Sequence, residues 1–356
     1  MAYGDWDDFL IHQSVTTLDH VENSDPNWTD RFYFNCHARD GSALITCGYG
    51  VFPNQQMSNG YAKLALADGR HWDVVAGRSC INDRWNPAVG PMEWHVIEPR
   101  RRWRLKLGPN PSGLEWDIEY IARAPIWELK PIFGRKRGRV IVHQQHIQQS
   151  ANYKGWVRFD GETMSVDGFY GSRDRTWGIR NHPAIDMWIW YAAQFDDRAI
   201  AAWVWERKDG AVMYVDGGFC HQDGTISRRF VKMSHELEFD RNLKRSTRGK
   251  IVFVDEDGKS YTIKAVAQHP DVNVYYGAML EKSDALVQGQ RWNEREIPVL
   301  RRVEAGSLAS DQLMRYELDG MVGYGIMELY VAGDGYDRYS ANWAPWVESA
   351  SAARSE

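Results

Sequence analysis

The chain has 356 residues, with 43 lysines and arginines against 48 aspartates and glutamates, which gives a formal net charge of −5. This balance argues against a nucleic-acid-binding protein, because such proteins gather positive charge on one face. No run approaches the roughly 20 apolar residues of a membrane helix, so we expect no integral membrane segment. The first residues are acidic and no long apolar run follows them, unlike a signal peptide, so we expect a cytoplasmic protein.

Aromatic residues are abundant, with 17 Trp, 17 Tyr and 12 Phe. Such side chains line pockets for flat or apolar ligands, but they are also favoured in β-strands, so the composition leaves both interpretations open. The cysteines and histidines lack metal-ligand spacing, and no glycine-rich nucleotide motif or G-x-S-x-G elbow is present. We therefore expect no metal and no cofactor.

Short segments of alternating apolar and polar residues follow one another along most of the chain. Asp-Gly pairs and other turn signals separate them, which is typical of antiparallel strands joined by hairpins. Amphipathic helices are scarce, so we predict an all-β fold. The predicted strand segments are 31–41, 42–52, 61–77, 103–113, 113–124, 138–149, 155–168, 187–195, 199–219, 249–267 and 320–333.

One domain boundary is predicted near residues 180–187. A first series of strands ends there, and a second series of similar length begins at Met187. We expect an N-terminal β-domain over residues 1–185 and a C-terminal β-domain over residues 186–347. The remaining residues 348–356 are small and polar, so a disordered tail is predicted there.

The densest group of polar and charged side chains lies in segment 167–182, DGFYGSRDRTWGIRNH. Its glycines predict a loop, in which neighbouring guanidinium groups would keep the Asp174 carboxylate ionised and oriented. Such a loop could place an acid–base pair against an apolar substrate. It could equally be an arginine–aspartate clasp that fixes the linker between the domains.

The segment GFYGSRDRTWGIR resembles the signature G-x-R-D-H-S-W-G-x-R of the hydroxyneurosporene synthase-like superfamily, which includes carotenoid 1,2-hydratase and AttH. The resemblance extends to HQQHIQQSANYKGWVRFDGETMSVDG, to GYGIMELY and to the N-terminal stretch ENSDPNWTDRFYFNCHARDGSALITCGYGVFPN. It implies two consecutive lipocalin-like antiparallel β-barrel domains with a ligand cavity near their junction. It also implies chemistry that needs no metal and no redox cofactor.

The chain departs from this signature at Arg175, where the superfamily usually has histidine. Arginine is not an ordinary general acid because its pKa is above about 12, but it binds oxyanions, phenolates and carboxylates. Hydration of a carotenoid is therefore not expected. A polar or aromatic substrate with an anionic or phenolic group is favoured instead.

The resemblance also implies the candidate catalytic residues. Asp174 matches the catalytic carboxyl, and Tyr170 matches its tyrosine partner with a longer spacing. His146 is the nearest match for the histidine; His143, three residues earlier on the same predicted strand, points to the other face. Trp188 and Trp190 share one strand face. The predicted substrate-binding residues are Arg173, Arg175, Trp177, Arg180, Trp188 and Trp190.

Together these observations predict a cofactor-independent lyase or isomerase of the hydratase, dehydratase or C–C/C–O lyase type. It would act by acid–base chemistry on a hydrophobic or aromatic small molecule, such as a lignin-derived phenolic or a terpenoid, in a cavity between the domains. The alternative is a non-catalytic carrier of a hydrophobic ligand. A carbohydrate-active protein would need a pair of carboxylates across a cleft. A homodimer is left open.

Overall fold

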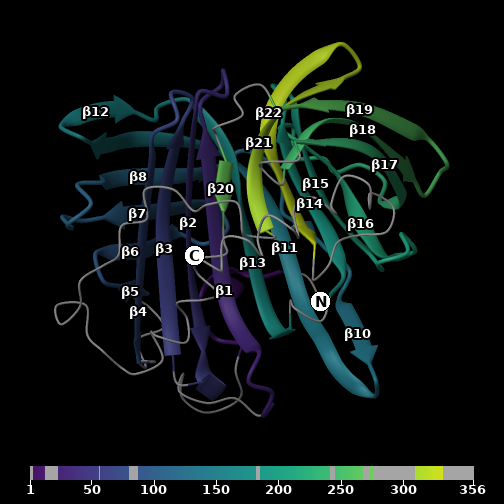
Figure 1. The fold of residues 1–356 in the computed structure, drawn as a ribbon, viewed down its shortest axis with the longest axis horizontal. Coiled ribbons are helices and arrows are strands. Elements are labelled where there is room, and N and C mark those ends of the chain that lie inside the picture. Colours follow the sequence, from purple (N-terminus) through teal and green to yellow (C-terminus); the bar gives the residue numbers. More distant parts are fainter. Residues whose placement is uncertain are drawn as a thin grey trace, which may run out of the picture.

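The computed structural model describes residues 3–12, 23–55, 57–79, 87–181, 185–240, 245–267, 273–275 and 309–331; the predicted tail 348–356 lies outside these ranges. The described residues form twenty-two β-strands and two short 3-10 helices, η1 (Asp5–Asp8) and η2 (Pro53–Gln55). They include no helix of the length and apolar character needed to span a bilayer. The all-β prediction is confirmed, with the strands in two antiparallel sheets (Figure 1).

The first sheet contains strands β1–β13 in the order β4-β3-β2-β1-β13-β11-β8-β7-β6-β5. β4 and β5, at the two ends of this order, come into contact, so the sheet curls into a nearly closed barrel. β11 is long and also pairs with β9, β10 and β12. The strands are β1 (Trp28–His37), β2 (Ala43–Phe52), β3 (Met57–Leu66), β4 (His71–Ser79), β5 (Ala88–Val89), β6 (Met92–Glu98), β7 (Arg102–Leu107), β8 (Glu115–Ala122), β9 (Trp127–Glu128), β10 (Ile132–Lys136), β11 (Arg139–Phe159), β12 (Glu162–Ser165) and β13 (Phe169–Arg180).

The second sheet contains strands β14–β22 in the order β16-β15-β14-β22-β21-β19-β18-β17, drawn in green to yellow in Figure 1. β16 and β17, at the two ends, again lie in contact, and β20 pairs with β21. The strands are β14 (Met187–Gln194), β15 (Arg198–Glu206), β16 (Val212–His221), β17 (Phe230–Asp240), β18 (Arg245–Asp255), β19 (Ser260–Val266), β20 (Asn273–Tyr275), β21 (Ala309–Leu318) and β22 (Met321–Val331).

Among the residues described, the buried apolar side chains form three clusters rather than two. One fills the first barrel around Phe32 and Trp103, and one fills the second around Ile189 and Phe253. The third lies between the barrels and contains residues of both sheets, among them four tryptophans of β14 and β15. Strands of both sheets near this contact therefore bury both of their faces, which explains why β14 and β15 read as almost continuous apolar runs.

The signature segment forms a central strand and not the predicted loop. β13 pairs with β1 on one side and with β11 on the other. Its glycines allow close approach of the neighbouring strands: a Cβ on Gly171 would lie 2.0 Å from the Asn35 carbonyl oxygen, and Gly178 has a φ of +117°. Because a strand alternates its side chains, Arg173 and Arg175 face the first barrel, and Asp174 faces the opposite way.

An N-terminal segment, residues 3–12, is attached to the first barrel by buried charges. Asp8 pairs with Arg173, and the Tyr3 hydroxyl donates to Asp8 Oδ1 at 2.6 Å. His12 lies between two carboxylates: its Nε2 is 3.1 Å from Asp7 Oδ1, and its Nδ1 is 3.1 Å from Asp30 Oδ2. Burial lowers the pKa of His12, but Asp30 and Asp7 outweigh it, so this pKa lies above the usual 6.5.

We expect His12→Gln to destabilise the fold more in acid than in base. A histidine whose pKa is higher in the folded state stabilises the fold to its full extent at a pH below the unfolded-state pKa of about 6.5. This stabilisation is lost as the pH rises through the folded-state pKa. Urea denaturation of wild type and variant at about pH 5.5 and about pH 8.5 measures the difference. An equal loss of stability at both pH values would contradict a protonated His12.

Candidate functional site

The outward face of β13 carries Asp174 into the contact between the two sheets. In the register of the first sheet, Asp174 is directly opposite Tyr33 of β1 and Gln148 of β11. His146 of β11 is opposite Thr176, two residues further along β13, so it shares this face. The sheet thus brings together two of the predicted catalytic residues, Asp174 and His146.

Asp174 has the environment of a carboxyl whose pKa is raised toward neutral pH. Its side chain is 15% exposed, and its Oδ2 is 3.9 Å from His146 Nε2, beyond hydrogen-bond distance. Its Oδ1 is buried and has no hydrogen-bond partner. Burial raises the pKa of Asp174 from 3.8 to about 6, although the positive charges of Arg31 and Arg180 act in the opposite direction.

His146 is a neutral imidazole with both ring nitrogens engaged. The Trp190 indole N–H donates to Nε2 at 3.2 Å, so Nδ1 carries the hydrogen and donates to Thr176 Oγ1 at 2.6 Å. Burial, together with Arg180 and Arg31, places the pKa of His146 well below its usual value. The ring of Trp203 packs beside it, with centroids 4.6 Å apart.

Four tryptophans of the second sheet face this polar cluster. The pairs Trp188–Trp205 and Trp190–Trp203 lie directly across β14 and β15, so all four project from one face. The Trp188 ring stacks on Tyr330 at 3.9 Å. We refer to Trp188, Trp190, Trp203 and Trp205 as the tryptophan wall. The expectation that Trp188 and Trp190 share one face is met, and that face lies between the two sheets.

Two arginines stand on the same face as Asp174. Arg31 of β1 is opposite Thr176, and Arg180 is the last residue of β13. The Arg180 Nε is buried without a hydrogen-bond partner. Burial and the like charge of Arg31 lower the pKa of Arg180 from 12.5 to about 9. The Glu328 carboxylate of β22 adds a negative charge to the cluster and accepts a hydrogen bond from Trp188 Nε1 at 2.5 Å.

Tyr33 and Asp311 are site residues that the sequence did not reveal. The Tyr33 hydroxyl donates to Asp311 Oδ2 of β21 at 2.5 Å, and both side chains are buried. They are 278 positions apart, and no local motif connects them. Strand alternation alone could have placed Tyr33 on a face with Arg31, but its nearness to Asp174 depends on β1 pairing with β13.

Tyr170 does not meet Asp174. It lies four residues earlier on β13, about 13 Å along the strand, and its hydroxyl is 3.4 Å from Asp196 Oδ1. The guanidinium groups of Arg39 and Arg123 lie 4.4 and 4.2 Å from the centre of its ring. This arrangement joins the two sheets at the rim of their contact rather than supplying a hydroxyl to the carboxyl.

Three predicted substrate-binding residues are on the wrong face for that role. Arg173 and Arg175 are fully buried in the first barrel, where they pair with Asp8 and Asp30. Trp177 stacks on His12 with ring centroids 3.7 Å apart. These arginines therefore form ion pairs with Asp8 of the N-terminal segment and Asp30 of β1, and not the predicted clasp with Asp174 at the linker.

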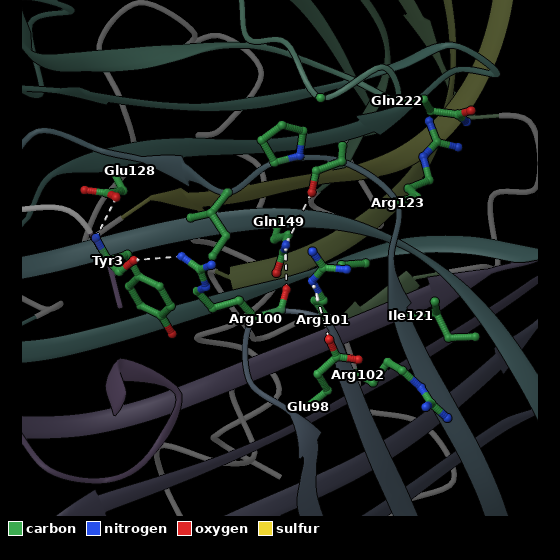
Figure 2. A pocket seen from close by; sticks show the side chains of 15 residues that line it. Tyr3, Glu98, Arg100, Arg101, Arg102, Ile121, Arg123, Glu128, Gln149 and Gln222 are labelled. Carbon is green, nitrogen blue, oxygen red and sulfur yellow. Dashed lines mark hydrogen bonds and ion pairs between the residues drawn. The ribbon is translucent and has the colours of Figure 1, made fainter. Parts of the chain in front are cut away.

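A separate groove opens at the edge of the contact between the sheets, with a cavity volume of about 670 Å³. Figure 2 shows Arg100, Arg101 and Arg102 near its centre, with Gln222 close to Arg123 at the upper right. Arg100, Arg101 and Arg102 are each paired with a carboxylate of the first sheet or the N-terminal segment. Asp174 and His146 do not line this groove.

No group of three or more His, Cys, Asp or Glu side chains that could hold a metal ion occurs among the residues described. The side chains available around Asp174 are instead an acid, a neutral imidazole, arginines and aromatic rings. This set can transfer a proton, bind an oxygen function and hold an apolar ligand.

Comparisons with known proteins agree with the fold. The sequence model of a family of unknown function (DUF8625) matches residues 3–336, and no curated protein matches the sequence. A candidate AttH from Nitrosomonas europaea is 15% identical with a TM-score of 0.61, covering 87% of this chain and 93% of its own. Kievitone hydratase from Nectria haematococca is 13% identical with a TM-score of 0.55, and the match covers 92% of this chain and 98% of the hydratase. CghA is 12% identical with a TM-score of 0.57, and the match covers 91% of this chain and 94% of CghA.

At these identities the solved structures establish a shared fold and no more. The predicted resemblance to AttH-type proteins is confirmed at this level, and so are the two lipocalin-like β-barrels. The match over residues 3–336 covers nearly the whole chain. This chain has the tandem lipocalin-like fold of the candidate AttH. By its sequence, the protein belongs to the family of unknown function DUF8625.

Proposed function

We propose that this protein is a cofactor-independent enzyme of the hydratase, dehydratase or C–C/C–O lyase type. It acts by acid–base chemistry on a hydrophobic or aromatic small molecule that lies between the two sheets. The observation that carries the proposal is Asp174, a carboxyl with a pKa of about 6 and an unpartnered buried oxygen opposite the tryptophan wall. A carboxyl tuned toward neutral pH is suited to general acid catalysis.

In the hydration direction, the protonated Asp174 carboxyl gives its proton to one carbon of a C=C bond, whose π electrons form the new C–H bond. Water adds to the other carbon and returns a proton to the Asp174 carboxylate, so the carboxyl ends as it began. Dehydration is the reverse. The tryptophan wall stabilises the electron-poor carbon through the faces of its rings. That a kievitone hydratase shares the fold supports a reaction of this class.

His146 acts in this proposal as a positioning residue. Its Nε2 accepts from Trp190 and its Nδ1 donates to Thr176, so the imidazole fixes one ring of the tryptophan wall beside Asp174. Of the predicted substrate-binding arginines, only Arg180 keeps this role. The other two are engaged inside the first barrel.

Single substitutions of Tyr170 and Tyr33 show which of these two tyrosines supports the reaction at Asp174. We expect Tyr170→Phe to leave turnover within about twofold of wild type, because its hydroxyl contacts Asp196 at the rim. Tyr33→Phe removes the hydroxyl of the residue directly opposite Asp174 on β1, which donates to Asp311, and turnover should fall by about tenfold or more. Steady-state kinetics of both variants measure this contrast, with the substrate identified from a library of phenolic dimers and terpenoids. Equal losses in the two would assign Tyr170 a role in the site.

The proposal is tested by incubating the protein with a mixed library of lignin-derived phenolic dimers and terpenoids in D₂O, followed by mass spectrometry of products and of the native protein. We expect a product changed by one water or by a carbon fragment. A hydration product should also carry deuterium on carbon, because the acid delivers a solvent-derived proton. The matched control is Asp174→Asn, which keeps the shape of the side chain and removes the acid. Equal product formation by both proteins would contradict the role of Asp174.

A carrier function is the second candidate, and the continuous tryptophan wall favours it, since such a surface binds flat ligands without chemistry. A ligand retained by the protein at unchanged mass, with no product in solution, would assign that function.

We further propose that the barrels are two domains, residues 1–185 and 186–347, in a cytoplasmic protein. Separate expression of each segment, with circular dichroism of the product, tests the division.

A further inference from the structure

Arg180 differs from the other arginines of β13 in its lack of a carboxylate partner. Arg173 pairs with Asp8 and Arg175 pairs with Asp30. Within the part of the chain that the structure describes, the Arg180 guanidinium forms no ion pair or side-chain hydrogen bond, and its Nε is buried without a partner. Removing this Nε–H from water without a compensating hydrogen bond is costly to the fold, and the residue as a whole is only partly exposed.

The surroundings of Arg180 favour an added negative charge. Burial and the like charge of Arg31 lower its pKa to about 9, and the negative charges of Asp174 and Glu328 offset this only in part. Arg180, Asp174 and Thr176 project from one face of β13, so a molecule lying along this face meets the cation and the acid together. The tryptophan wall covers the same face from the second sheet.

We propose that the substrate carries a carboxylate, or a comparably acidic oxygen, which Arg180 binds while the apolar part of the substrate packs on the tryptophan wall. The planar fork of arginine binds both oxygens of a carboxylate in parallel. This inference rests on the proposed function in placing the reacting carbon near Asp174. It narrows the substrate to aromatic or terpenoid acids, because a neutral terpene would leave Arg180 without a partner.

Binding of paired probes tests the inference without requiring turnover. The probes are trans-cinnamate and 2-naphthoate, each compared with its uncharged amide of nearly the same shape. Dissociation constants are measured by isothermal titration calorimetry at neutral pH. We expect wild type to bind each carboxylate roughly 10- to 100-fold more tightly than its amide. Arg180→Met should remove this preference, and Arg180→Lys should keep a part of it because it retains the charge.

Arg102→Met is the matched control, since it removes the same charge from a partly exposed pair with Glu119 outside the site, and it should bind as wild type does. Equal affinity for acid and amide in wild type, a preference that survives in Arg180→Met, or no carboxylate binding at millimolar concentration would overturn the inference. Asp174→Asn should keep the carboxylate preference. If Asp174→Asn keeps both the carboxylate preference and wild-type turnover, the proposed reaction is contradicted, while carboxylate binding by Arg180 is still supported.

Discussion

Replacing Asp174 by asparagine is expected to lower turnover at least 100-fold, because the variant keeps the geometry of the site and loses the proposed proton donor. The same change should stabilise the protein above neutral pH. The pKa of this carboxyl rises from 3.8 to about 6 on folding, chiefly by burial. A carboxyl with a raised pKa favours folding below its unfolded-state value, and this contribution is lost as the pH rises toward 6.

Once the carboxyl is ionised, this pKa shift lowers the free energy of unfolding by about 3 kcal/mol. The asparagine variant should regain about 1–3 kcal/mol of that stability. Urea denaturation at about pH 7.5 measures the gain, which should disappear near pH 4. The rate of wild type should fall as the pH rises through 6 if protonated Asp174 acts in the slow step. A variant that is both inactive and less stable at pH 7.5 would point to a structural role for Asp174.

Replacing Arg173 by methionine is expected to destabilise the fold by about 3–5 kcal/mol, because it leaves the Asp8 carboxylate buried without its cation. Arg173 also lies over the rings of Trp103 and Tyr120 in the first barrel, at 5.5 Å from each ring centre, so packing is lost as well. Chemical denaturation at neutral pH measures the loss.

Two further variants separate the charge from the packing. Asp8→Asn combined with Arg173→Met should regain part of the lost stability, since the unpaired carboxylate is gone. Arg180→Met is the matched control on the same strand; it removes an arginine that has no carboxylate partner among the described residues, so its cost should be small. If Arg180→Met were as destabilising as Arg173→Met, the separation between a structural and a ligand-binding face of β13 would be wrong.

The alternation of side chains and the turn signals were sufficient to predict the all-β class, and the signature around Asp174 was sufficient to predict the fold. Both are local properties of the chain. The same holds for Trp188 and Trp190, whose shared face follows from their spacing of two on a strand. His146 could be selected because it lies on the strand that precedes the signature and pairs with it.

The composition of the site depended on which strands become neighbours, which a local pattern does not encode. β1 pairs with β13 across more than 130 positions, and this pairing alone places Tyr33 beside Asp174. The contact between the sheets then brings Asp311 to the Tyr33 hydroxyl. The segment around Asp174 looked like a loop because of its glycines, yet those glycines serve close strand packing.

Once that segment is a central strand, its alternation sends Arg173 and Arg175 into the first barrel and leaves Asp174 and Arg180 on the face that meets the second sheet. The sequence by itself determined the all-β class, the fold and the choice of Asp174 as the candidate acid. Only the tertiary structure decided which charged groups face that acid, because burial between two sheets selects one face of each strand and pairs residues that are distant along the chain.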